Sequence, residues 1–337
     1  MAELHVWMNG LHVGVWSTLR TGTPVFRYAE AWPHIEEGRA LSLSLPITAS
    51  LEHRGDVVEH YFDNLLPDSA AIRRRLRSRF HARSTDAFDL LAAIGRDCVG
   101  AVQLLAPGVE PSGWNVIDAE PVNEAEVERI LAAVTSDAPL GQRGDEDLRL
   151  SIAGAQEKTA LLRMGRRWYR PRGATPTTHI LKLPLGLVGN MQADMSTSIE
   201  NEWLCGRILG ALGLPVAETE MAQFGSAKVL VVTRFDRRWV GIDEGAEQKA
   251  RFRPPQDSWI ARLPQEDFCQ ALGAGPDRKY QSDGEFRSAV DRYCEDFEKL
   301  LKDVARNDRD NVLTQTYLTS DTGKVYTMLA HAAGRLR

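Results

Sequence analysis

The segment RLSIAGAQEKTALL, residues 149–162, gives the main indication of the fold. Apolar residues at both ends flank a short run of small and polar residues, which indicates a strand, a loop and a second strand. Ala153, Gly154 and Ala155 leave room for backbone N–H groups to approach phosphate oxygens closely, and Lys158 adds a positive charge. The loop matches neither the Walker A pattern nor the kinase G-x-G-x-x-G pattern. An ordinary hairpin turn is therefore the alternative to a phosphate-binding loop.

A lysine stands within the next apolar run, TTHILKLP at 177–184. A lysine in the middle of such a strand is costly to bury unless an anion or a carboxylate pairs with it. In protein kinases a strand lysine binds the α- and β-phosphates and pairs with a helix glutamate, and Lys182 fits that role. The predicted helix that follows, at 199–215, supplies Glu200 and Glu202 as candidate acids. The alternative is an edge-strand lysine whose ammonium group reaches water.

The apolar segment AKVLVVT continues into the charged segment RFDRRW, together residues 227–239. This change suits a hinge between two lobes, where backbone groups can pair with an adenine edge. The alternative is a solvated strand end that carries Arg234, Arg237 and Arg238. The order of loop, lysine strand, helix and hinge strand predicts the N-terminal lobe of a kinase.

The residues before this lobe predict a β-rich region with inserted helices. LHVWMNGLHVGVWS at 4–17 alternates apolar and polar residues around an Asn-Gly pair, which is a strong hairpin signal. ALSLSLP at 40–46 alternates and ends at a proline, as is typical of a half-buried strand. The helix predicted after residues 67–69 carries six arginines within 73–83. We expect a solvated helix face there, with contact to an acidic partner or to nucleic acid as the alternative.

Composition limits the class of protein. The chain has 337 residues, of which 43% are hydrophobic and 26% charged, and its formal net charge is -5. These values fit a globular protein of about two domains and exclude a generally basic nucleic-acid coat. No apolar run approaches the roughly 18 residues of a membrane span, and the first residues do not resemble a secretory signal. We therefore expect no membrane partner. The four cysteines are far apart, which favours a reducing compartment, so we expect a cytoplasmic protein.

The sequence divides into three predicted parts. Residues 108–147 are rich in turn-forming and acidic residues, which favours a domain boundary there. The polar, proline-rich segment 241–258 predicts a surface insertion. An amphipathic helix is predicted after residue 284. We therefore expect an N-terminal subdomain, a kinase-like ATP-binding lobe and a divergent helical segment, at 1–140, 141–284 and 285–337.

Seven collinear motifs carry a resemblance to the HipA family of bacterial Ser/Thr kinases, which are the toxins of HipBA toxin–antitoxin modules. The resemblance implies an α+β fold, with a β-rich N-terminal subdomain, a protein-kinase-like N-lobe and an incomplete, largely helical C-lobe. It also implies the use of ATP and Mg²⁺, a HipB-like antitoxin partner, DNA contact only through the antitoxin complex, and glutamyl-tRNA synthetase as protein substrate. The motifs are FDNLLPDS (62–69), FDLLAAIGRDCVGAV (88–102), SIAGAQEKTALLR (151–163), TPTTHILKLP (175–184), NEWLC (201–205), RFDRRW (234–239) and RLPQEDFCQ (262–270).

The resemblance also implies roles for particular residues. Lys182 would bind the α- and β-phosphates of ATP. Ser151 matches the autophosphorylated serine of the family, where a phosphate can pull the loop away from ATP. The family usually has an acidic residue where this chain has Thr233, at the start of the adenine hinge. The loop over the phosphates would comprise Ala153, Gly154, Ala155, Gln156, Glu157 and Lys158, and the hinge Thr233, Arg234 and Phe235.

The sequence departs from the family in its catalytic half. The family's D-G-H-x-K-N loop and its later metal-binding aspartate have no match. Asp308 and Asp321 are weak candidates for a catalytic carboxylate, because neither has an asparagine five residues later to bind a metal ion; Tyr326 has that place after Asp321. Two functions stay open. One is a C-terminally shortened HipA-like kinase, and the other is a truncated or pseudokinase form that binds antitoxin or ATP without catalysis.

Overall fold

The computed structural model describes residues 2–135, 150–154, 156–188, 193–243, 245–249, 252–278 and 284–306. The chain divides into two compact units, Met1–Pro276 and Asp277–Arg337. Within the described part of the second unit the chain forms helix α7 (Gly284–Ala305), which confirms the helix predicted there. All strands and the other α-helices belong to the first unit. Each helix of the described chain is too short or too polar to cross a lipid bilayer.

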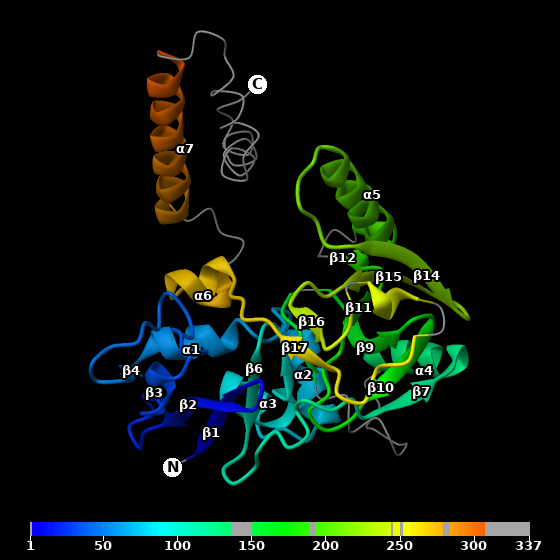
Figure 1. Ribbon diagram of the computed structural model, residues 1–337, viewed down its shortest axis with the longest axis horizontal. Coiled ribbons are helices and arrows are strands. Elements are labelled where there is room, and N and C mark those ends of the chain that lie inside the picture. Colours follow the sequence, from blue (N-terminus) through cyan, green and yellow to red (C-terminus); the bar gives the residue numbers. More distant parts are fainter. Residues whose placement is uncertain are drawn as a thin grey trace. The chain divides into compact units, whose positions relative to one another are not determined.

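A five-stranded antiparallel sheet forms the N-terminal part of the first unit (Figure 1). The predicted hairpin is confirmed, and its turn residues Asn9 and Gly10 have φ of 45° and 83°. Positive φ at both central residues matches the right-handed twist of the two strands. The strand order is β4-β3-β2-β1-β6, with bounds β1 (Glu3–Met8), β2 (Leu11–Thr18), β3 (Pro24–Tyr28), β4 (Glu52–Arg54) and β6 (Val102–Leu105).

Three helices lie between the strands of this region, and aromatic packing holds the first and the third of them to the sheet. The Trp16 ring stacks on Phe62 with centroids 4.1 Å apart, and both side chains are fully buried. The predicted arginine-rich helix begins at its cap Ser69, whose hydroxyl accepts the N–H of Ile72. The helices are α1 (Asp56–Asp63), α2 (Ala70–Arg79) and α3 (Ala87–Ile94), and a short 3₁₀ turn covers Trp32–His34.

The strand predicted over residues 40–46 is wrong. The segment is a tight turn, in which Leu45 N–H donates to the Ser42 carbonyl over 3.1 Å. The Ser42 and Ser44 hydroxyls both donate to the carbonyl of Gln270, over 3.0 and 2.6 Å. Serine side chains that bond to backbone groups compete with strand pairing. The alternation of leucine and serine in this segment therefore does not come from a strand. Leu45 is buried, whereas Leu43 is exposed.

A six-stranded antiparallel sheet forms the second part of the first unit. Along its strands, alternation and register divide the side chains between two faces. Leu161, Leu181 and Val231 pack against helix α4 on one face, and Ala160 and Lys182 point to the other. The order is β14-β15-β11-β9-β10-β7, with bounds β7 (Ala119–Val122), β9 (Lys158–Met164), β10 (Arg167–Pro171), β11 (His179–Lys182), β14 (Thr219–Phe224) and β15 (Ala227–Thr233).

The remaining elements join and flank the two sheets. Strands β5 and β8 pair in parallel, and β12–β13 and β16–β17 form two further antiparallel pairs. The predicted α+β fold with a β-rich N-terminal region is therefore confirmed. The bounds are β5 (Asp97–Cys98), β8 (Leu150–Ser151), β12 (Gly186–Val188), β13 (Ala193–Met195), β16 (Arg237–Val240), β17 (Trp259–Arg262), α4 (Glu124–Thr135), α5 (Ser198–Ala211), α6 (Phe268–Leu272), and 3₁₀ turns at Ala246–Gln248 and Pro276–Arg278.

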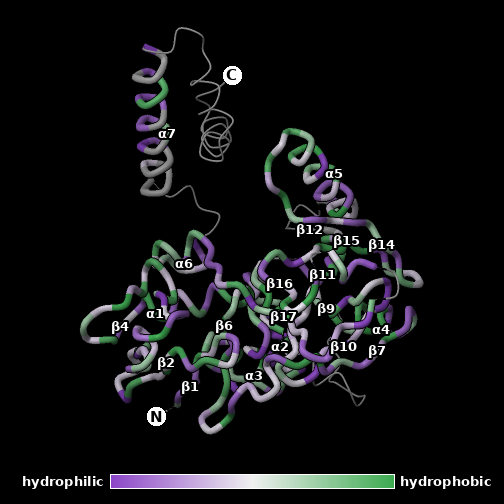
Figure 2. The backbone as a smooth tube through the Cα atoms, in the orientation of Figure 1, coloured by the Kyte–Doolittle hydropathy of each residue, from purple (hydrophilic) through white to green (hydrophobic). Residues whose placement is uncertain are grey.

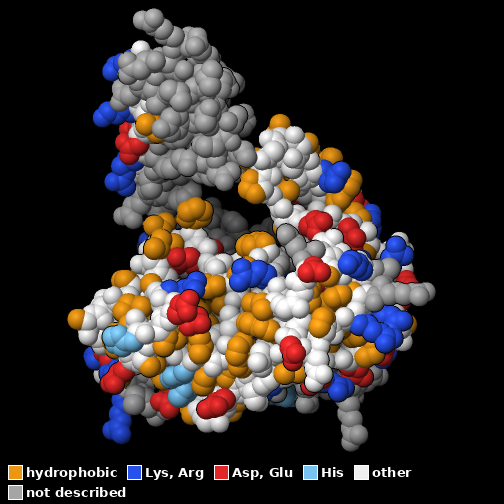
Figure 3. Space-filling model, viewed as in Figure 1, with side chains coloured by type: hydrophobic (Ala, Val, Ile, Leu, Met, Phe, Trp, Pro, Cys, Tyr) orange, Lys and Arg blue, Asp and Glu red, His pale blue; other side chains and the backbone are white. Residues whose placement is uncertain are grey.

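Helix α5 carries apolar side chains on its surface. Figure 2 shows hydrophobic residues in green along the helix, and Figure 3 shows orange side chains exposed there. Leu204 and Ile208 are 52% and 51% exposed, whereas Ile199, in the first turn, is fully buried. The N-terminal end of α5 is therefore the end that packs into the unit, and this end holds Glu202.

A buried ion cluster joins β5 to β16, to β17 and to the segment between β15 and β16. Asp97 on β5 accepts from Arg237 Nη2 over 2.9 Å and lies 3.1 Å from Arg262 Nη2. Asp236 accepts from Arg234 Nη2 over 2.7 Å and from Arg237 Nη1 over 3.0 Å. Burial opposes the ionisation of Asp97, but the attraction of the three guanidinium groups outweighs it and holds the pKa of this carboxyl far below its usual range. The cluster is thus charged in the folded protein.

We predict that Asp97→Asn destabilises the first unit strongly. The substitution leaves three buried guanidinium groups with one carboxylate, and breaking a buried pair from one side typically costs about 3–5 kcal/mol. Urea denaturation followed by circular dichroism measures the free energy of unfolding. Asp257→Asn is the matched control, because Asp257 is exposed near β17. A loss no larger than that of the control would show that the cluster contributes little.

Candidate nucleotide-binding site

Lys182 lies at the end of β11, a strand with neighbours on both sides, β9 and β15. The edge-strand alternative is therefore wrong. Its Nζ lies 2.5 Å from Oε1 of Glu202 on α5, and the two side chains are 22% and 40% exposed. The structure thus forms the lysine–glutamate pair that the sequence suggested. The pair leaves the lysine ammonium group in a fixed position at one end of the sheet.

A second ion pair connects the same helix to the same sheet. Glu200, two residues before Glu202, pairs with Lys228 on β15. The Lys228 side chain is 51% exposed, so water screens this pair more than the pair of Lys182. The two pairs together attach the N-terminal end of α5 to the sheet.

The predicted phosphate-binding loop follows β8, and the hairpin alternative is wrong. Ser151 of β8 pairs in parallel with Cys98 of β5, while β9 begins the second sheet at Lys158. Gly154 has φ of 112°, which favours glycine. A Cβ on Gly154 would lie 2.6 Å from Nζ of Lys158, so the lysine lies close to the loop backbone. Ala155 lies outside the described residues.

Two lysines come together at this end of the sheet. Lys158 and Lys182 are direct cross-strand partners of β9 and β11, and such partners project from the same face. Like charges at opposed positions are unfavourable unless an anion lies near both. Glu202 supplies one negative charge beside Lys182. The structure thus places two cations on one face at this end of the sheet.

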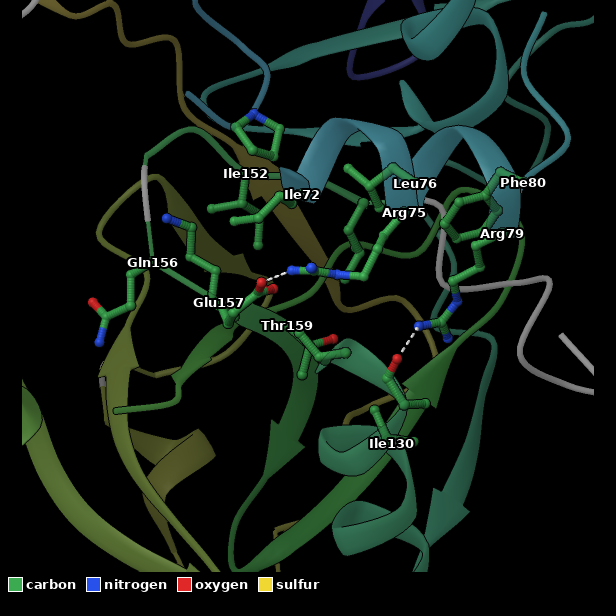
Figure 4. A pocket seen from close by; sticks show the side chains of 15 residues that line it. Ile72, Arg75, Leu76, Arg79, Phe80, Ile130, Ile152, Gln156, Glu157 and Thr159 are labelled. Carbon is green, nitrogen blue, oxygen red and sulfur yellow. Dashed lines mark hydrogen bonds and ion pairs between the residues drawn. The ribbon is translucent and has the colours of Figure 1, made fainter. Parts of the chain in front are cut away.

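Hydrogen bonds and one ion pair hold the described residues of the loop. Gln156 Nε2 donates to the Leu183 carbonyl over 2.6 Å, and Leu183 N–H donates to the Glu157 carbonyl over 3.0 Å. The Glu157 carboxylate pairs with Arg75 on α2, as Figure 4 shows. The loop is thus attached both to the end of β11 and to the N-terminal region.

Ser151 has no exposed surface, although the family resemblance implies its phosphorylation. Its hydroxyl donates to the carbonyl of Leu65 over 2.8 Å. A phosphate group with nearly two negative charges has no room in this environment. Phosphorylation of Ser151 therefore requires β8 and the loop to move first.

The predicted hinge comprises Thr233, the last residue of β15, and Arg234 and Phe235 after it, and each has a different environment. The N–H groups of Thr233 and Arg234 donate to the carbonyls of Glu218 and Thr178, both over 2.9 Å. The Arg234 side chain is buried in the ion cluster, while Phe235 is 71% exposed. The alternative of a solvated arginine strand end is wrong for Arg234 and Arg237, and holds for the exposed Arg238.

The structure does not place the catalytic candidates. Asp308 and Asp321 both lie outside the described residues. Within the described ranges, no three His, Cys, Asp or Glu residues come together as ligands for a metal ion. We therefore assign no step of the reaction to a metal ion.

Two groups that contribute to this region escaped the sequence analysis. Asp97 is the central carboxylate of the ion cluster, and Arg75 pairs with the loop. Arg75 stood in a run of arginines that suggested a solvated face. Asp97 stood in a motif of the family resemblance, and no local pattern marked it as buried.

A polar cavity of about 310 Å³ lies beside His179. The side chains of His179 and Leu181 share a face of β11, so the cavity opens on the face opposite Lys182. Burial and the nearby charge of Arg163 lower the pKa of His179 to about 3. The Thr178 hydroxyl lies 2.8 Å from its Nδ1. The imidazole of His179 is thus neutral at ordinary pH.

We predict that His179 makes the protein less stable as the pH falls. Its pKa is lower in the folded state, so below about pH 6.5 the unfolded chain binds a proton that the folded chain does not. Stability should therefore decrease by up to about 1.4 kcal/mol per pH unit toward about pH 4. Urea denaturation at about pH 7 and pH 5 should show a smaller decrease for His179→Gln than for the wild type. His34→Gln, at an exposed position, is the control, and an equal decrease for both variants would contradict the prediction.

Comparison with known proteins gives matches over both parts of the chain. Residues 4–105 match the family model described as the HipA N-terminal domain, and residues 150–318 match the HipA-like C-terminal domain. The putative kinase Y4mE of Sinorhizobium fredii (strain NBRC 101917 / NGR234) is 35% identical over 284 residues, which are 83% of this chain and 61% of the relative. The serine/threonine-protein kinase toxin HipA of Shewanella oneidensis is 25% identical over 282 residues, which are 83% of this chain and 57% of that protein.

A solved structure matches the fold as well. It is the complex of HipA, HipB and operator DNA from the toxin–antitoxin system of Shewanella oneidensis MR-1. The TM-score is 0.60 at 25% identity, and the match covers 85% of this chain and 60% of the solved chain. The chain therefore spans about three fifths of the length of the curated relatives it matches.

Proposed function

The chain belongs to the HipA family of kinases, and from this membership we propose that it is a serine/threonine-protein kinase toxin that binds ATP. The reaction would transfer the γ-phosphate of ATP to a hydroxyl group of a protein. The observation that carries the proposal is the ion pair of Lys182 and Glu202 next to the loop that ends at Lys158. In kinases this pair positions the lysine on the α- and β-phosphates.

In this proposal different residues bind different parts of ATP. Lys158 and Lys182 project from the same face of the second sheet, so a nucleotide on that face would have two cations beside its phosphates. Lys158 and the loop backbone would bind the phosphates, and the main chain at Phe235 would bind the adenine edge. Such fixed donors stabilise charge at no reorganisation cost during the transfer.

Ser151 offers a means of regulation in this proposal. A phosphate on its hydroxyl would replace the 2.8 Å hydrogen bond to Leu65 with a charge that cannot stay buried. The loop would then leave the nucleotide site, and the kinase would lose ATP affinity. Autophosphorylation would thus limit the activity of the toxin.

The proposed partners follow from the relatives. A structural relative is assembled with HipB and operator DNA, which supports a HipB-like antitoxin as partner and DNA contact through that antitoxin. Glutamyl-tRNA synthetase as the substrate rests on the family resemblance. ATP and Mg²⁺ are the cofactors that a kinase of this kind uses.

A second function has one observation in its favour. The 337 residues contain no D-G-H-x-K-N sequence, which in the family supplies the catalytic carboxylate. A chain with the phosphate-binding residues but without this loop would bind ATP or antitoxin without transferring phosphate.

We predict that Lys182→Ala weakens ATP binding by at least tenfold, because it removes the cation paired with Glu202. Isothermal titration calorimetry with ATP measures the dissociation constant. Lys228→Ala is the matched control, because this lysine also pairs with a glutamate of α5 and lies on the same sheet. If both variants bind ATP like the wild type, the nucleotide site lies elsewhere.

Transfer is tested separately from binding. With labelled ATP and Mg²⁺ we expect label on Ser151, and on glutamyl-tRNA synthetase when it is added. Ser151→Ala should remove the first signal and keep the second, and mass spectrometry identifies the labelled residues. Nucleotide binding without any label would reject the kinase and support the non-catalytic module.

A further inference from the structure

Arginines of α2 contact the chain itself and not only solvent. Arg73 Nη1 donates to Asp63 over 2.5 Å, and Arg79 Nη1 donates to the Ala133 carbonyl over 3.2 Å. Arg75 pairs with Glu157, the residue before Lys158. The expectation of a uniformly solvated face is therefore wrong for these three arginines. Arg74 and Arg77 are exposed, as expected.

The pair of Arg75 and Glu157 connects the N-terminal region to the phosphate-binding loop. Figure 4 shows the Arg75 guanidinium group reaching across the pocket to the Glu157 carboxylate. The two side chains are 21% and 24% exposed. Partial burial reduces screening by water and salt, so such a pair is worth more than an exposed one.

Apolar packing between α2 and the loop is incomplete. A cavity of about 80 Å³ lies between them, and its lining includes Ile72 and Leu76 of α2, Ile130 of α4, and Ile152 of the loop. A void forfeits the dispersion contacts that packed side chains would make. The ion pair therefore carries a larger share of the attachment between α2 and the loop.

The position of Glu157 matters for both lysines of the site. Its backbone accepts the N–H of Leu183, which follows Lys182, and its neighbour Lys158 lies close to Gly154. We infer that Arg75 is a positioning residue that holds the phosphate-binding loop in its nucleotide-binding arrangement. Nucleotide affinity then depends on helix α2 of the N-terminal region. The inference rests on the proposed function and adds a residue that touches no nucleotide.

The first test measures ATP affinity by calorimetry. Arg75→Ala should weaken binding by roughly tenfold, which is within the usual range for coupling between sites. Arg75→Lys should retain most of the affinity, and Arg75→Glu combined with Glu157→Arg should restore what each single variant loses. Arg77→Ala, an exposed arginine of the same helix, should bind like the wild type. Equal affinity of Arg75→Ala and Arg77→Ala would overturn the inference.

The second test does not depend on ATP. Hydrogen–deuterium exchange of the peptide that covers residues 152–158 should be faster in Arg75→Ala than in the wild type and in Arg77→Ala. Glu157→Gln removes the same ion pair from the loop side and should give the same increase in exchange rate. This second variant keeps the test possible if Arg75→Ala fails to fold. Unchanged exchange in both variants would overturn the role of Arg75. If the two variants exchange faster than the wild type but the wild type binds no ATP, the proposed function is rejected and the role of Arg75 in attaching the loop is kept.

Discussion

The requirement that buried charges be neutralised determines how the first unit is assembled. Asp97, Asp236 and three arginines come from distant segments of the chain, and each group is costly to bury alone. Only the folded arrangement brings them together, so the strand β5 of the N-terminal region and the segment after β15 are held in one position. The hinge that would bind adenine is thereby fixed by a carboxylate that lies 137 residues before Arg234.

The same interaction explains what the sequence could and could not predict. The hairpin at Asn9 and the helix that begins after Ser69 follow from local sequence patterns, and both were confirmed. The pair of Lys182 and Glu202 was suggested because a strand lysine needs a carboxylate. The pairing of Asp97 depends on contacts far apart in sequence, which no local pattern records. The strand predicted over residues 40–46 was wrong for a related reason, because the serines of this segment bond to Gln270 far along the chain.

The predicted N-terminal subdomain also supplies elements to the second sheet. Strand β7 pairs with β10 of the second sheet, and α4 packs against that sheet, although both precede the predicted boundary near residue 140. That boundary itself lies outside the described residues and stays a prediction. The local sequence could not show which sheet each of these elements would join.

The loop itself lies between two sets of attachments. Ser151, Gly154 and Glu157 are bonded to Leu65, Asp68 and Arg75, so the whole loop is attached to one short N-terminal segment. The two lysines of the second sheet attract anions from the other side. A phosphate on Ser151 would break the bond to Leu65 and place negative charge where it cannot be solvated. Because the other two attachments lie within six residues, release of the loop and loss of the phosphate-binding arrangement would then be one event.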